Sequence, residues 1–156
     1  MAHTRKTILD ALKDRLATLA GFADDGKVSR ARTSAINKED LPALTVSWAD
    51  DDEVSRLRPS SVIEGNELTH GYERTIPVSI VVHVADNEPE DAFDAIAELI
   101  EIELKEFGFL GEAVTDFHLI STRFYVDPTT GLSLGAGRLI YLLDYKTAAD
   151  PSKPAI

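Results

Sequence analysis

The sequence predicts an α+β fold, an α/β sandwich in which a mostly antiparallel sheet of about four or five strands carries two helices packed on one face. The first observation is the alternation of apolar residues from 72 to 84, which predicts a long strand with one well-buried face. The second is a pair of apolar stripes at helical spacing, in residues 4–22 and 89–107. The third is the turn chemistry of residues 127–131, which predicts that the last two strands form a hairpin.

Each element has a local signal. Gly21 ends the first helix plausibly, and Pro42 opens a half-buried edge strand. Pro89, followed by acidic residues where the helix dipole favours them, starts the second helix, which Gly108 stops. The expected order is a helix (4–22), a short strand (27–32), a strand (44–48), the long strand (72–84), a helix (89–107) and two strands (114–126 and 134–146).

The segment from Asp50 to Thr69 lacks periodicity and is polar. Compact domains rarely keep so long an irregular segment without using it, so we expect an arm, a lid or a disordered loop.

The last two strands are apolar on both sides. In the first of them we place Ile120, Phe124 and Val126 on one side, with Leu119 and Tyr125 on the other. Two-sided strands in a small chain suggest that the second sheet face meets another subunit.

Composition bounds the class of protein. A chain of 156 residues with 44% hydrophobic and 28% charged residues is expected to fold as a single domain, here residues 1–147, with a disordered tail at 148–156. The absence of cysteine excludes disulfides, thiolate metal sites and a cysteine nucleophile. The N-terminus is amphipathic and no stretch approaches the length of a membrane span, so we expect a soluble protein made in the cytoplasm, without membrane contact.

The formal net charge of −11 argues against nucleic-acid binding as the main activity, because such proteins collect Lys and Arg to replace phosphate counterions. An acidic wall could instead let DNA pass without holding it.

Few residues indicate chemistry. Asp50-Asp51-Asp52-Glu53 could gather a divalent cation for a hydrolase, but consecutive loop residues point in different directions, so a solvated acidic loop is favoured. His83 and His118 lie on strands and could be neighbours, although no metal-binding motif surrounds them. Gly135-Ala136-Gly137 is better explained by a bulge or close approach within a strand than by a phosphate loop. No serine lies in a nucleophile elbow, so we expect no enzymatic activity and no cofactor or metal.

The layout resembles the family of lambda-type phage tail terminators, the minor tail proteins that end the tail. The resemblance rests on the N-terminal helix, the strand Leu41-Pro42-Ala43-Leu44-Thr45-Val46 and the long strand from Arg74 to Val84. It continues through the helix after Asn87-Glu88-Pro89-Glu90-Asp91 and the strand ending Phe124-Tyr125-Val126-Asp127, and closes with the apolar strand from Leu139 to Tyr145. It covers roughly residues 4–147 as a pattern of elements, and the segment 52–68 and the tail align least well.

This resemblance implies a structural subunit in the virion tail, assembled in the host cytoplasm. Such a subunit forms a hexameric ring that caps the tail tube, stops its polymerisation and offers a surface for head–tail joining. The implied partners are further copies of the chain, the tail tube protein and the head–tail connector protein, with DNA passing through the lumen. The alternatives are another neck or tail-completion subunit, a generic oligomeric binding module, or a metal-dependent hydrolase using Asp50–Glu53. The candidate partner-binding residues are Arg56, Arg58, Ile63, Phe124, Tyr125, Tyr141 and Tyr145.

Overall fold

The structure is a computed structural model that describes residues 2–31, 40–49, 52–64, 67–127 and 134–152. Its sheet has the order β1-β2-β4-β6-β5. β3 pairs with the first part of β4, on the same edge of β4 that pairs with β2 further along. Only β1 and β2 are parallel among the described strand pairs. The α+β class and the mostly antiparallel sheet are confirmed, with six strands in the described part of the chain. The strands are β1 (Val28–Arg30), β2 (Ala43–Trp48), β3 (Val54–Glu64), β4 (Glu67–Ala85), β5 (Val114–Asp127) and β6 (Leu134–Ala148).

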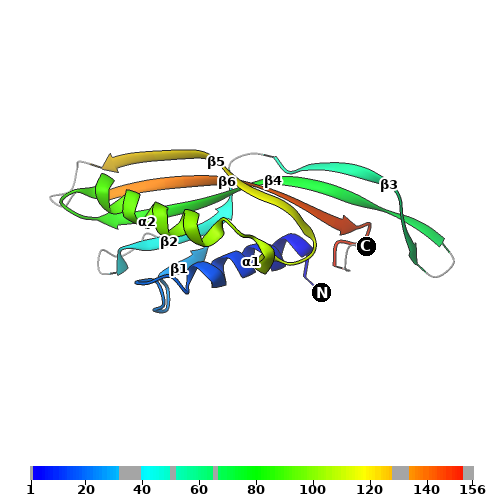
Figure 1. Cartoon of the computed structure of the whole chain (residues 1–156), viewed down its shortest axis with the longest axis horizontal. Helices are drawn as coiled ribbons and strands as arrows, with labels where there is room; N and C mark the ends of the chain where they lie inside the picture. Colours follow the sequence, from blue (N-terminus) through cyan, green and yellow to red (C-terminus); the bar gives the residue numbers. More distant parts are fainter. Residues whose placement is uncertain (1, 32–39, 50–51, 65–66, 128–133, 153–156) are drawn as a thin grey trace.

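Two helices, α1 (Thr4–Leu16) and α2 (Pro89–Leu104), pack on one face of this sheet, as expected (Figure 1). A short 3-10 helix, η2 (Gly108–Leu110), follows α2. Successive side chains of a strand lie on opposite faces, so alternate residues of β4 and β6 meet the helices in one hydrophobic core. No helix among the described residues is long and apolar enough to cross a membrane. The helix residues buried in that core are Ile8, Leu9, Leu12, Leu16, Phe93, Ala97, Ile100 and Leu104.

The first helix ends earlier than expected, at Leu16 instead of Phe22. The hydroxyl of Thr18 donates a 2.6 Å hydrogen bond to the carbonyl of Arg15, which gives a carbonyl at the helix end a partner outside the helix. The chain then turns through Gly21, whose φ of +90° disfavours an L side chain. Leu19 and Phe22 remain buried, so the apolar pattern of this segment outlasts its helical geometry.

The expectation of an irregular segment between residues 50 and 69 is wrong for most of its length, because β3 pairs antiparallel with β4 from Val54 opposite Thr75 to Glu64 opposite Glu67. The pairing of β4 with β6 stops at Gly71, which also faces Arg58 of β3. Residues 59–64 and 67–70 therefore extend beyond the part of β4 that pairs with β6, and we call them the arm (Figure 1). The segment lacks a regular apolar alternation, so this strand could not be recognised from the spacing of its apolar residues. Residues 50–51 and 65–66 lie outside the described residues.

A bulge in β5 corrects the predicted faces of that strand. Leu119 pairs with Tyr141 and Ser121 with Ile140, so Ile120 is an extra residue that shifts the alternation by one. Leu119 and Phe124 consequently lie on the same, helix-covered face, although the simple alternation separates them. The predicted separation of Phe124 from Tyr125 remains correct.

The two ends of the chain meet. Ala148 still belongs to β6, and the carbonyl of Pro151 accepts hydrogen bonds from the backbone N–H of Thr4 at 2.9 Å and from its hydroxyl at 2.7 Å. Ala148 thus extends the last strand one residue past the expected end of the domain, and Pro151 lies against the start of α1. Residues 153–156 lie outside the described residues, as do residues 128–133, which include most of the expected hairpin turn at 127–131.

Candidate functional site: the open sheet face and the start of β3

One face of the sheet has no helix over it among the described residues (Figure 1). We call this surface the open face. The strand registers place rows of residues across it, one of which runs from Thr45 through Val81 and Arg138 to Arg123. The face mixes polar and apolar side chains. Its central members are Thr45, Ser47, Ser79, Val81, His83, Arg123, Tyr125, Arg138, Ile140 and Leu142.

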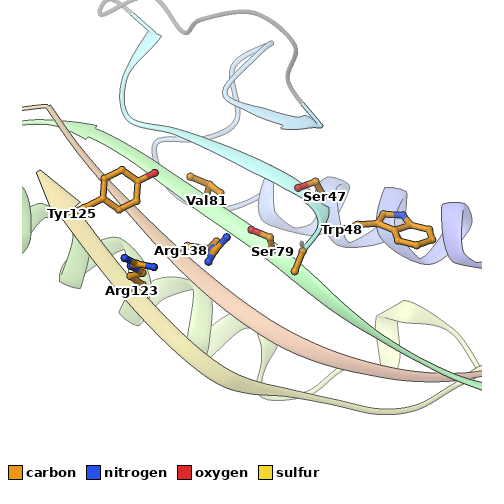
Figure 2. A pocket seen from close by; sticks show the side chains of 8 residues that line it. Ser47, Trp48, Ser79, Val81, Arg123, Tyr125 and Arg138 are labelled. Carbon is orange, nitrogen blue, oxygen red and sulfur yellow. The ribbon is translucent and has the colours of Figure 1, made fainter. Parts of the chain in front are cut away.

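A hollow of about 500 Å³ lies on the open face (Figure 2). Its walls come from β2, β4, β5 and β6, and Arg123 stands directly opposite Arg138 in the antiparallel register. Tyr125 is 57% exposed at its margin. The lining residues are Ser47, Trp48, Ala49, Ser79, Val81, Arg123, Tyr125 and Arg138.

The chemistry of this hollow is that of a contact surface. Two guanidinium groups offer planar sets of N–H donors that suit carboxylates, and Tyr125 and Ser79 add hydroxyl groups. The described lining contains no carboxylate or imidazole that could act as a general base. The hollow therefore fits an anionic partner group better than a reaction.

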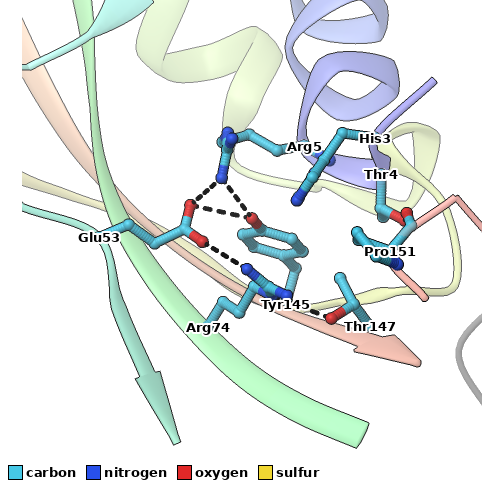
Figure 3. A network of polar contacts seen from close by, with 8 residues as sticks. All are labelled: His3, Thr4, Arg5, Glu53, Arg74, Tyr145, Thr147 and Pro151. Atoms are coloured by element: carbon cyan, nitrogen blue, oxygen red, sulfur yellow. Dashed lines mark hydrogen bonds and ion pairs between the residues drawn. The ribbon is translucent and has the colours of Figure 1, made fainter. Parts of the chain in front are cut away.

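A second cluster ties the start of β3 to α1, β4 and β6 (Figure 3). The carboxylate of Glu53, with its side chain only 8% exposed, accepts hydrogen bonds from Arg5 at 2.7 Å, Arg74 at 3.2 Å and the Tyr145 hydroxyl at 2.9 Å. Arg74 also donates to the hydroxyl of Thr147 at 2.9 Å. Burial, together with the neighbouring Glu53 charge, raises the pKa of Tyr145, which keeps its hydroxyl a donor. This Glu53 network joins α1, β4 and β6 at the point where β3 begins.

The structure separates the seven predicted partner-binding residues. Arg56 is exposed on β3, Arg58 is half-buried with Nη2 3.4 Å from the Thr147 carbonyl, and Tyr125 is exposed on the open face. Ile63 lies on β3 opposite Leu68, and its side chain is outside the described part of the structure.

The other three predicted residues belong to the core, which is a correction. Tyr141 is 3% exposed and stacks on Phe117, and Tyr145 is 1% exposed within the Glu53 network. Phe124 is half-buried and stacks on Phe93 of α2. These rings lie on the helix-covered side, where aromatic burial contributes to folding and leaves little surface for a partner.

The acidic segment does not form a metal site in the described residues. Asp50 and Asp51 lie outside them, and Glu53 points into the network with two arginines. No group of His, Asp or Glu side chains suited to a metal ion is found in the ranges that the structure describes.

The two strand histidines are not neighbours, which corrects that possibility. His83 lies opposite Ala136 of β6 with Nε2 3.2 Å from the Thr45 hydroxyl, whereas His118 lies opposite Leu142 with Nδ1 2.9 Å from Asp116. A whole strand, β6, and several residue rows separate them.

The glycines of β6 act through close approach, as expected. A Cβ on Gly137 would lie 1.9 Å from the Phe93 ring, and one on Gly135 would lie 2.9 Å from the Phe124 ring. Glycine here lets two aromatic rings rest on the sheet backbone.

Sequence reasoning missed the Arg123–Arg138 pair and the Glu53 network. A register centred on the predicted turn at 127–131 would not place these arginines opposite each other, and only the observed register, with Asp127 opposite Leu134, pairs them. The network joins residues from distant parts of the chain and left no local pattern.

A scan against protein-family models finds no match to this chain, and a sequence search of curated proteins finds none either.

Proposed function

We propose that this chain is a structural subunit that assembles with copies of itself into a ring and ends a phage tail, the role implied by its resemblance to the tail terminators. The observation that carries the proposal is the one-sided covering of the sheet. Both helices lie on one face, while the open face carries Val81, Ile140 and Leu142 beside an arginine pair. Another copy would supply the missing cover.

Two further features support the proposal. The arm reaches past the main sheet, where a ring subunit would touch a neighbour, the tube protein or the connector. The net charge of −11 suits a ring whose lumen passes DNA without holding it, because like charges do not trap phosphates. The described contacts of the Glu53 carboxylate hold the start of β3 against α1, β4 and β6, which suits a structural role.

The assembly claim is tested with the purified chain. We expect light scattering after size exclusion to give a mass of about six subunits, and negative-stain images to show closed rings. A strict monomer at high protein concentration would refute the proposal.

The terminating role needs a separate assay in a phage that encodes this chain. We expect loss of the chain to give overlong tails of variable length, which expression from a plasmid corrects. Tails of normal length that fail to join heads would point instead to a neck or connector subunit.

A further inference from the structure

The outer surface of α2 is acidic and partly apolar. The helix has no lysine or arginine, and its Leu99 and Ile102 are 41% and 56% exposed. These two residues lie three apart and therefore share one side of the helix. The acidic residues of α2 are Glu90, Asp91, Asp94, Glu98, Glu101 and Glu103.

The helix dipole favours Glu90 and Asp91 in the first turn, but it does not favour the acidic residues at the other end of α2. Glu101 and Glu103 occupy the end of α2, where the helix dipole favours cations, and the last turn has no basic residue. Arg15 neutralises Glu103 through a 2.6 Å contact. An acidic surface that disfavours its own helix, beside exposed apolar side chains, indicates a surface shaped for a partner.

We propose that the outer surface of α2 of one subunit docks on the open face of the next. The carboxylates of Asp94 and Glu98 would reach the arginine pair Arg123 and Arg138, and Leu99 and Ile102 would cover the apolar side chains around the hollow. The two surfaces are complementary in charge and each includes exposed apolar area. This inference rests on the proposed function, because it takes the partner to be a second copy.

The geometry favours a head-to-tail contact. The open face and the outer surface of α2 lie on opposite sides of the same subunit, so neither can satisfy the other within one chain (Figure 1). Two open faces packed on each other would bring two arginine pairs together, which repels. A contact between two different surfaces repeats from copy to copy and closes into a ring when its rotation allows.

Charge reversal tests the pairing. We expect Arg123→Glu and Glu98→Arg each to raise the concentration needed for assembly by roughly a hundredfold, since each places like charges in the contact. The matched control is Lys6→Glu, a charge reversal at an exposed position of α1 that should leave assembly unchanged. Circular dichroism and thermal unfolding check the fold. If a reversal unfolds the subunit, Arg123→Gln and Glu98→Gln should still weaken assembly by about tenfold.

Mixing the two reversed variants gives the decisive measurement. The α2 surface of the Glu98→Arg variant meets the open face of the Arg123→Glu variant with opposite charges restored, and the remaining contacts are wild type. The mixture should therefore form rings that neither variant forms alone. Native mass spectrometry, with one variant carrying a mass tag, should find equal numbers of both.

The outcomes separate this inference from the proposed function. If the wild type assembles and neither reversal changes it, this inference is overturned and the proposed function stands. If both reversals prevent assembly but the mixture stays unassembled, direct pairing of these surfaces is overturned. A monomeric wild type refutes the proposed function itself.

Discussion

Replacing Glu53 with glutamine should destabilise the fold by removing the shared acceptor of the Glu53 network. The glutamine keeps the size of the side chain but leaves Arg5 and Arg74 without their counter-charge. Loss of one partner from a buried ion pair costs ~3–5 kcal/mol, largely through the unpaired charge that remains. Since the two arginine side chains keep 21% and 15% of their surface exposed, water offsets part of that cost. We therefore expect a loss of ~2–4 kcal/mol.

For a chain of this length the loss corresponds to a fall in Tm of roughly 6–12 °C. The measurement is thermal and urea unfolding, followed by circular dichroism at one fixed protein concentration, because self-association would stabilise the folded state. Tyr145→Phe, which removes one hydrogen bond to the same carboxylate, should cost about 1.5 kcal/mol.

The matched control is Glu103→Gln. Glu103 also bonds an arginine at 2.6 Å, but the side chains of that pair are 28% and 46% exposed. Pairs of this kind contribute ~0.2–1 kcal/mol. If Glu53→Gln costs no more than Glu103→Gln, burial does not strengthen the Glu53 network and the reasoning is wrong.

Three other changes test the close packing, the first helix and the arm. Gly137→Ala should cost ~2–4 kcal/mol, because the new Cβ would lie 1.9 Å from the Phe93 ring, whereas Gly108→Ala, with open space around it, should be nearly neutral in urea unfolding. Burial, and next the charge of Arg5, lowers the pKa of His3 below its ordinary 6.5, and its neutral ring accepts a backbone hydrogen bond at the start of α1. The unfolded chain therefore binds the proton more readily, so the stability of the fold should fall as the pH drops below 6.5. In the His3→Asn variant, Tm should change less between about pH 7 and 5.5 than it does in the wild type. Replacing residues 59–70 with Asn-Gly should leave the core folded, as measured by circular dichroism, and should abolish the terminating activity in the tail-length assay. An unfolded product would contradict the separation of arm and core.

The elements that pack on the core could be predicted from the sequence. A helix or strand with one buried face must repeat its apolar residues at that element's own period, so α2 and the central part of β4 are visible in the order of residues alone. The covering of one sheet face by both helices follows from the same patterns, since each element has to bury its apolar side. The net charge and the lack of cysteine can be read directly from the sequence, and the close approach at Gly135 and Gly137 could be predicted from it.

Tertiary structure alone decided the rest, because strand pairing and side-chain contacts join residues that are distant in the chain. β3 pairs with β4 without a regular apolar alternation in the sequence, and the extra residue at Ile120 reverses the faces of β5 without any local sign. The exposure of Tyr125 and the burial of Tyr141 and Tyr145 depend on which side of the sheet the helices cover. The two guanidinium groups of the open face, and the carboxylate that Arg5, Arg74 and Tyr145 share, come together only through the register of the strands and the packing of α1 on them.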